Sequence, residues 1–180
     1  MNGPELYEIW RQKGALVLCR HDYKKTGLCF SAVFGPNMVS EIGRLHFQAG
    51  YFLEDLSAMQ VKEGYLVTYH YDSAENPGRL AIRALADERL SLTSLSGVYQ
   101  GAEWHEREAR DFLGLNFIGN PNPIPLLLPH DFPGPPPLRR EEKDLAAMKD
   151  LKLFGDQPEV LDPAWGPIVG LAADPKEAEA

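Results

Sequence analysis

GAEWHEREARDFLG, residues 101–114, is the most informative stretch of this 180-residue sequence. Positions on one stripe recur at spacings of three and four from Leu95 to Phe112, and Gly114 follows at the end of the pattern. Residues three and four apart share a face of an α-helix, and glycine commonly ends one. The spacing therefore predicts the longest helix of the chain over 95–113.

Charged residues crowd this predicted helix. Neighbours at i and i+4 would pair Glu103 with Arg107, Glu106 with Arg110, and Arg107 with Asp111. A self-stabilised, solvated face is the simplest interpretation, because each such pair contributes about 0.2 to 0.5 kcal/mol.

Two functional interpretations compete with a solvated face. A catalytic pair of carboxylates is disfavoured, because Glu106 and Glu108 point about 200° apart around a helix and do not face one substrate. Trp104, an aromatic residue among charges, is typical of an anchor at a protein interface.

Outward from this helix, helical and strand patterns are segregated more than they alternate, which predicts an α+β fold with an antiparallel or mixed sheet and helices packed on it. The turn Glu75-Asn76-Pro77-Gly78 joins two strands of period two into an antiparallel hairpin. The expected elements are helices at 4–13 and 37–49, strands at 15–20 and 28–34, and the hairpin strands at 64–71 and 79–86.

The composition changes after Ile118. Eight of the 15 prolines lie between Pro121 and Pro137, which excludes a regular helix or a central strand there. We expect a domain over 1–118 and an extended, proline-rich C-terminal arm over 119–180, with a short charged helix at 139–152. An extended apolar chain needs a surface to lie on. The residues expected to dock on a partner are Leu126, Leu127, Leu128, Phe132, Leu138 and Arg139.

Composition and motifs narrow the function classes. The net charge of −8 makes a nucleic-acid or anionic-membrane surface an unfavourable partner. Cys19 and Cys29 are too few for an iron-sulfur cluster or a zinc knot, and both are expected as buried free thiols. The sequence contains neither phosphate-binding glycine motif nor an apolar run long enough to span a bilayer. We therefore expect no catalytic, cofactor-binding or metal site in this chain, and contact with a membrane only through partners.

The central helix also carries a family resemblance. Residues 104–114, WHEREARDFLG, resemble the W-x-E-R-E-x-x-D-x-x-G signature of the 30 kDa-type subunit of NADH-quinone oxidoreductase (respiratory complex I). FLEDLSA at 52–58 is similar to the family's F-L-x-D-L-[ST]-A, and PLRR at 137–140 resembles its P-L-R-K. The resemblance covers about 36–140. Its signature positions, expected at an interface, are Trp104, Glu106, Arg107, Glu108, Asp111 and Gly114.

The sequence departs from the family after the helix. Residues 119–128 read GNPNPIPLLL, where members typically have G-H-P-D-L-R-R-I-L. The histidine and both arginines are missing, so relatives of the enzyme stay open as alternatives: membrane-bound energy-converting hydrogenases, formate hydrogenlyase and archaeal F420-dependent enzymes.

The resemblance implies a non-catalytic structural subunit in the peripheral arm of an oxidoreductase complex, on the cytoplasmic side of the membrane. Its implied partners are a quinone-module subunit resembling the hydrogenase large subunit, and small iron-sulfur subunits. Iron-sulfur clusters, and flavin or nickel-iron centres, would belong to these partners. Two other classes remain as alternatives: a stand-alone hydrolase that uses carboxylates of the 103–111 helix, and an adaptor whose 121–137 arm binds a signalling partner.

Overall fold

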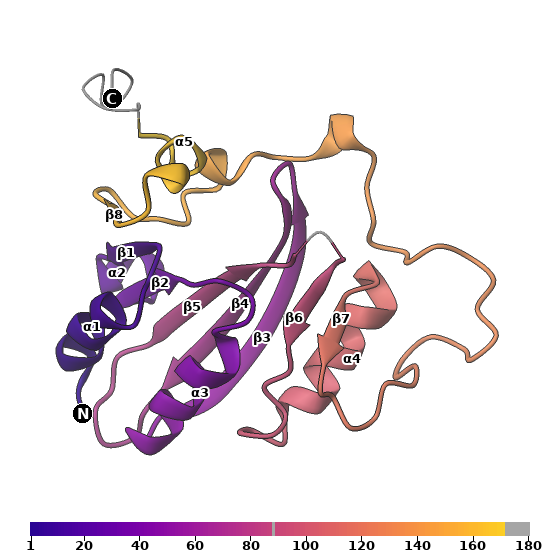
Figure 1. Ribbon diagram of the computed structural model, residues 1–180, viewed down its shortest axis with the longest axis horizontal. Coiled ribbons are helices and arrows are strands. Elements are labelled where there is room, and N and C mark those ends of the chain that lie inside the picture. The colour runs from indigo at the N-terminus through magenta and orange to yellow at the C-terminus, as the bar shows by residue number, and fades with distance from the viewer. Residues whose placement is uncertain (88, 172–180) are drawn as a thin grey trace.

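A six-stranded mixed sheet forms the centre of the computed structural model, which describes residues 1–87 and 89–171 (Figure 1). The strand order is β3-β4-β5-β2-β1-β8, and the neighbours are antiparallel except for the parallel pair β2 and β5. Together with the helices this confirms the α+β class. The strands are β1 (Val17–Arg20), β2 (Phe30–Val33), β3 (Phe52–Val61), β4 (Gly64–Asp72), β5 (Leu80–Leu85) and β8 (Glu159–Val160).

The N-terminal elements follow the sequence pattern. Helix α1 (Gly3–Gln12) begins with a capping box in which the side chains of Asn2 and Glu5 each bond the other's backbone N–H. Helix α3 (Val39–Gln48) is amphipathic, and the short helix α2 (Tyr23–Thr26) lies in the connection between β1 and β2. The predicted hairpin of β4 and β5 is confirmed, with Tyr69 opposite Ile82.

Helices α1, α3 and α4 (Ala102–Leu113) cover one face of the sheet. Alternate strand residues such as Leu18, Val67 and Tyr69 point into this first core, as the period-two pattern requires. The side chains that fill it from the helices are Leu6, Tyr7, Trp10, Val39, Ile42, Ala102, Ala109 and Leu113.

The central helix is shorter than its spacing predicts: α4 begins at Ala102, not at Leu95. Strand β6 (Ser91–Thr93) comes first and pairs in parallel with β7 (Asn116–Ile118) after the helix, as a separate two-stranded sheet. Between β6 and α4, the N–H of Leu95 bonds the carboxylate of Glu106 on the helix. Residues 94–101 therefore form a turn that packs against α4 and do not extend it. The apolar spacing continued through a turn, which periodicity alone does not distinguish from a helix.

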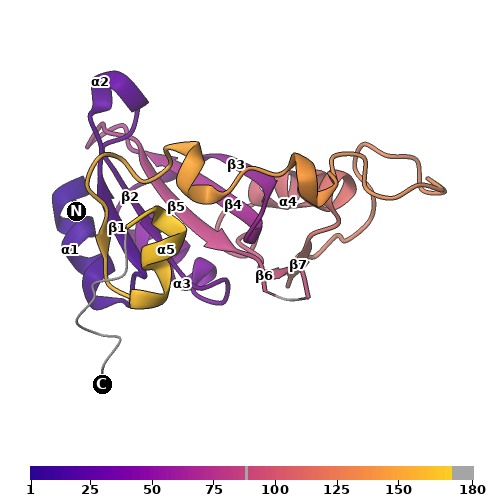
Figure 2. The same cartoon turned by 90° about the horizontal axis from the view of Figure 1, so that it is seen from above.

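Residues 142–169 return to the sheet. After α4 the chain runs back toward β1 through short 3-10 helices η1 (Glu142–Asp144) and η2 (Met148–Leu151), β8, η3 (Pro163–Trp165) and helix α5 (Gly166–Val169) (Figures 1 and 2). Met148, Phe154, Trp165 and Val169 form a second core on the other face of the sheet. Their partners there are Val17, Cys19, Val33, Val61 and Leu66.

Two expectations about this segment are therefore wrong. A helix at 139–152 is replaced by η1 and η2, and residues 148–169 belong to the core of this chain. The physical reason is that their large apolar side chains reach the sheet face that α1, α3 and α4 leave uncovered. A domain boundary at 118/119 stays a prediction.

Two further observations concern the fold as a whole. Both cysteines are free as expected, but only Cys19 is buried, whereas Cys29 is half-buried. Within the described residues, no helix is both long and apolar enough to cross a membrane.

Candidate interaction site: helix α4 and the proline-rich loop

Residues 119–141, here called the proline-rich loop, contain no helix or strand and lie against α4. Helix α4 ends at Gly114, which adopts the left-handed conformation with a φ of 75° and donates its N–H to the carbonyl of Arg110. Three signature residues on the helix, Glu106, Arg107 and Asp111, are buried. Each of them binds a different part of the surrounding chain.

Glu106 ties the segment before the helix to the start of the loop. Its carboxylate accepts the hydroxyl of Ser94 at 2.7 Å, the N–H of Leu95 at 2.6 Å and the side-chain amide of Asn120 at 2.8 Å. Burial raises the pKa of this carboxyl, and these hydrogen bonds oppose the rise. The group is a structural anchor, because three donors from two segments converge on it.

Arg107 holds the first half of the proline-rich loop. Its guanidinium donates to the carbonyls of Ile124 and Pro125, both at 3.0 Å, and to the carboxylate of Glu103, also at 3.0 Å. Arg110 adds a hydrogen bond to the carbonyl of Pro123. The planar, multi-donor guanidinium suits this task, since prolines leave carbonyls without partners in regular structure.

Asp111 holds the next turn of the loop. Its Oδ2 accepts the consecutive backbone N–H groups of Leu126, Leu127 and Leu128 at 2.9, 2.8 and 3.1 Å. At the end of the helix, the N–H of Leu138 bonds the carbonyl of Phe112, and Arg139 Nε bonds the carbonyl of Leu113. The loop therefore leaves α4 near Asp111 and returns to its C-terminus.

These contacts correct two expected ion pairs. Glu103 and Arg107 pair as predicted, but Glu106 with Arg110 and Arg107 with Asp111 form no ion pair among the described residues. Backbone groups of the proline-rich loop and of residues 94–95 compete successfully for these side chains. Sequence reasoning also missed Ser94 and Asn120, whose short polar side chains flank the helix and are typical of local hydrogen bonding.

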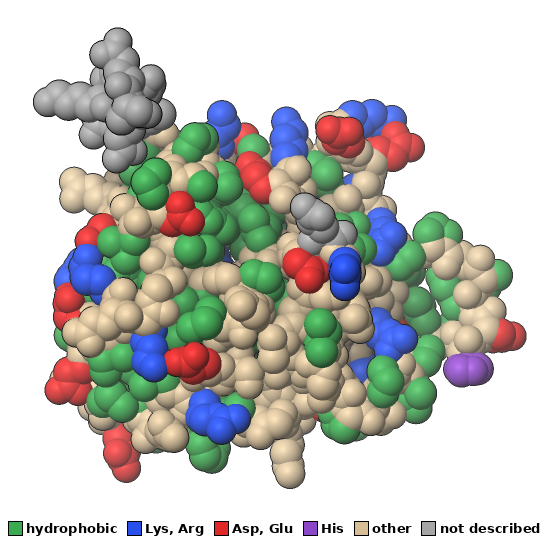
Figure 3. Space-filling view, in the orientation of Figure 1, with side chains coloured by type: hydrophobic (Ala, Val, Ile, Leu, Met, Phe, Trp, Pro, Cys, Tyr) green, Lys and Arg blue, Asp and Glu red, His purple; other side chains and the backbone are tan. Residues whose placement is uncertain are grey.

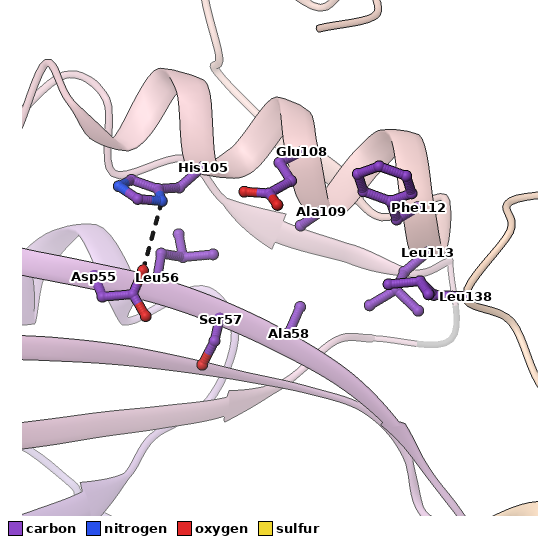
Figure 4. A pocket seen from close by; sticks show the side chains of 10 residues that line it. All are labelled: Asp55, Leu56, Ser57, Ala58, His105, Glu108, Ala109, Phe112, Leu113 and Leu138. Carbon is purple, nitrogen blue, oxygen red and sulfur yellow. Dashed lines mark ion pairs between the residues drawn. The ribbon is translucent and has the colours of Figure 1, made fainter. Parts of the chain in front are cut away.

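The outer face of α4 carries the remaining signature residues. Trp104 is 63% exposed, and Glu108 is exposed one turn later. Beside them His105 Nδ1 lies 3.6 Å from the Asp55 carboxylate on β3. Figure 4 shows Asp55, His105 and Glu108 beside a groove of about 280 Å³ between α4 and β3, with Phe112 and Leu138 at its other end.

The proline-rich loop presents apolar side chains to solvent. Leu127 is 60% exposed, Leu138 57%, Ile124 53% and Phe132 39%, whereas Leu126 and Leu128 are half-buried. In Figure 3, hydrophobic side chains gather on the lobe at the right edge of the molecule, where Figure 1 draws the loop. Arg139 is exposed at the end of the loop. Such a concentration of apolar side chains is typical of an interaction surface.

Two carboxylates of the helix are occupied within the chain. Glu106 and Asp111 each accept several hydrogen bonds from neighbouring segments. Residues 1–87 and 89–171 hold no group of three or more His, Cys, Asp or Glu side chains arranged for a metal ion. What the geometry favours is recognition by a held loop and an exposed helix face.

The sequence of this chain is similar to those of known proteins. Residues 37–146 match the family model of the respiratory-chain NADH dehydrogenase 30 Kd subunit. The C subunit of NADH-quinone oxidoreductase from Roseiflexus sp. (strain RS-1) is 33% identical over 116 residues, which cover 59% of this chain and 66% of the relative. The J subunit of NAD(P)H-quinone oxidoreductase from Prochlorococcus marinus (strain MIT 9215) is 44% identical over 63 residues, and the match spans 35% of each protein.

Solved structures share the fold. The trypsin-resistant fragment of Nqo5 superposes with a TM-score of 0.57 at 20% identity, covering 68% of this chain and 99% of the fragment. A chain of the membrane-bound sulfane sulfur reductase, an archaeal respiratory membrane complex, gives a TM-score of 0.61 at 19% identity, covering 83% of this chain and 89% of that one. The family match spans most of the chain and includes α4 and the proline-rich loop. The chain belongs to the family of the 30 Kd subunit of respiratory-chain NADH dehydrogenase.

Proposed function

We propose that this chain is a non-catalytic structural subunit in the peripheral arm of a complex I-like NADH-quinone oxidoreductase, and that it supports the quinone-module subunits during electron transfer coupled to ion translocation. One observation carries the proposal: a buried set of signature side chains holds the backbone of a loop whose apolar side chains face outward. Burying each large apolar side chain would contribute about 1.5 to 3 kcal/mol to assembly.

The partner that best fits this loop is a quinone-module subunit resembling the hydrogenase large subunit, with small iron-sulfur subunits nearby. In this proposal oxidoreductase activity belongs to the complex, and the clusters, with flavin or nickel-iron, reside in the partners. The chain attaches to the cytoplasmic side of the membrane only through those partners. Purified alone, it should be colourless and free of iron; flavin or cluster absorbance would contradict this part of the proposal.

A related complex is the second candidate. The loop sequence GNPNPIPLLL lacks the histidine and arginines typical of the NADH-driven enzyme. This departure favours, as an alternative, the equivalent subunit of a membrane-bound energy-converting hydrogenase or a formate hydrogenlyase. The subunits that co-purify decide between them, because an NADH-oxidising flavoprotein and a nickel-iron subunit are readily told apart by mass spectrometry.

Two other classes have less support. A hydrolase would need the carboxylates of α4 free, but Glu106 and Asp111 each accept several structural hydrogen bonds. An adaptor for a signalling partner would act outside a respiratory complex. The family and the fold of this chain are those of subunits of such complexes, which favours a subunit over an adaptor.

The test is purification of the tagged full chain from its native cell, in parallel with a double variant that carries Leu127→Ser and Phe132→Ser. We expect the parent chain to bring down a hydrogenase-large-subunit-like protein and iron-sulfur subunits, and the double variant to lose most of them. Phe47→Ser is the control, because Phe47 is also an exposed apolar residue but lies on α3. Recovery without any oxidoreductase subunit, or equal recovery with the double variant, would contradict the proposal.

A further inference from the structure

Strand β3 is an edge strand with a defined set of outward-facing backbone groups. Its neighbour in the sheet is β4, and within residues 1–87 and 89–171 no strand pairs with its other side. The carbonyl of Tyr65 on β4 accepts the N–H of Ala86, so the backbone N–H and C=O groups of Tyr65 point toward β5. The backbone groups of Gln60, the residue opposite Tyr65 on β3, therefore point away from β4. By the same alternation, the N–H and C=O groups of Leu56 and Ala58 also face outward.

The free stretch of this edge has two limits. At one end, a bulge between Leu53 and Asp55 interrupts the register. At the other end the chain's own segment takes over: the N–H of Lys62 donates to the carbonyl of Ala146 at 3.0 Å. Between these limits, in the part of the chain that the structure describes, the N–H groups of residues 56, 58 and 60 have no hydrogen-bond partner. The side chain of Gln60 is engaged there, because its Oε1 accepts the N–H of Arg140 at 2.8 Å.

A groove follows the free stretch. The hollow of about 280 Å³ between β3 and α4 continues into a second one of about 240 Å³, and the two share Ala58, Leu113 and Leu138. In Figure 4, side chains of α4 lie across from the β3 segment that begins at Asp55. Asp55 and Glu108 place two carboxylates at one end, where His105 Nδ1 lies 3.6 Å from the Asp55 carboxylate, and the shared residues make the middle apolar.

We propose that an extended segment of a partner chain pairs with the outer edge of β3 at residues 56–60 and directs a lysine or arginine toward Asp55 and Glu108. Main-chain hydrogen bonds to an exposed sheet edge give affinity in this mode of recognition, and pockets for alternate side chains give specificity. The carboxylates select a basic residue, whose aliphatic part fits the apolar middle of the groove.

Charge on this chain argues against two other occupants. A second copy of this chain carries the same net charge of −8 and would bring like charges together. The sequence of the last seven residues, DPKEAEA, has three acidic residues and one lysine, which suits an acidic groove poorly. The proposal does not depend on which complex contains the chain, so it can fail without the proposed function failing.

The test uses the full chain and a synthetic probe, the capped peptide acetyl-Thr-Val-Lys-Val-Thr-Val-amide. With the peptide at about 1 mM, the amide protons of Leu56, Ala58 and Gln60 should exchange with solvent at least about tenfold more slowly, as followed by NMR. The peptide N-methylated at alternate residues should not protect them, because it cannot donate to the edge. The peptide with glutamate in place of lysine should bind at least about tenfold more weakly.

Two variants sharpen the test. Glu108→Lys should reverse the preference between the lysine and glutamate peptides, whereas Glu142→Lys, an exposed substitution on η1, should leave it unchanged. Ala58→Pro removes one outward N–H, which an edge strand tolerates, and should abolish protection at Leu56 and Gln60. No protection at about 1 mM peptide, equal protection by the N-methylated peptide, or self-association through this edge would each overturn the proposal.

Discussion

A single carboxylate oxygen organises much of the proline-rich loop. Three consecutive N–H groups, those of Leu126, Leu127 and Leu128, converge on Asp111 Oδ2 at 2.8 to 3.1 Å. Prolines on both sides of this triplet prevent the loop from using a regular ladder, so a side chain has to supply the acceptor. The aspartate of the signature therefore acts on the loop from inside the molecule.

Replacement of Asp111 should loosen the proline-rich loop. Asp111→Ala leaves three backbone donors without their acceptor, at a cost of about 1.5 to 3 kcal/mol for a hydrogen bond to a charged group. Amide exchange of residues 126–128 should accelerate strongly while that of β4 stays slow. Asp131→Ala is the matched control, since Asp131 is exposed on the same loop. If both variants exchange alike, the loop is not held by Asp111.

Another residue gives the chain a pH dependence. His46 on α3 is fully buried, stacks on Tyr71 with ring centroids 4.4 Å apart, and donates from Nδ1 to the carbonyl of Ile42. Burial lowers its pKa to about 4 from an ordinary value of 6.5. As the pH falls, the unfolded chain therefore binds a proton before the folded chain does.

The free energy of unfolding should accordingly decrease as the pH falls from about 6.5 to about 4, by about 3 kcal/mol from this group, and then level off. His46→Phe keeps an aromatic ring in the stack and should make the free energy of unfolding depend less steeply on pH, by the contribution of one titrating group. Some slope should remain, because burial and the neighbouring Arg83 also lower the pKa of His21 to about 4. Urea unfolding at a series of pH values measures the slope; a parallel profile for the variant would contradict this assignment.

Among the helices and strands, apolar periodicity predicted those whose sequence alone shows which face is buried. Helices α1 and α3 follow their periodicity because each buries one face on the sheet, and the β4–β5 hairpin follows its turn sequence and the alternation along β4. The start of α4 was misplaced because Glu106, eleven residues on, captures the N–H of Leu95. Strand β3 was not predicted as a strand, since apolar and polar residues do not alternate regularly along FLEDLSAMQV and a bulge between Leu53 and Asp55 interrupts its register.

The end of α4 allows a matched pair of substitutions. Gly114 has a φ of 75°, and an added Cβ would lie 3.1 Å from Cγ of Pro136, so Gly114→Ala should destabilise the chain by at least about 1 to 2 kcal/mol. Gly101, before the helix, has a φ of −61° and open space around it, so Gly101→Ala should be neutral or slightly stabilising. Thermal unfolding of both variants checks the difference. Equal melting temperatures would show that the loop does not press on the helix end.

Across the molecule, the chain segment that follows α4 packs on two different surfaces. Residues 119–141 lie against α4, and residues 148–169 cover the second face around Met148, Phe154 and Trp165. The prolines correctly predicted an irregular path between these parts. The prolines did not indicate which surface the apolar residues after α4 cover, because these side chains would be removed from water equally well by a sheet face of this chain or by the surface of a partner.

This arrangement predicts how a protease should cut the isolated chain. Cleavage should fall within the exposed part of the proline-rich loop, at residues 127–137, and the two pieces should stay together, because β8 pairs with β1 and Phe154 is buried in the second core. Phe154→Ala removes a buried aromatic side chain, at a cost of about 3 to 5 kcal/mol, and should open a second set of cuts between residues 142 and 171. Phe132→Ala, at an exposed aromatic residue, should leave the second set absent. Mass spectrometry of a time course identifies the cuts. Rapid cleavage throughout 142–171 of the parent chain would mean that these residues leave the sheet in solution and that their burial depends on a partner.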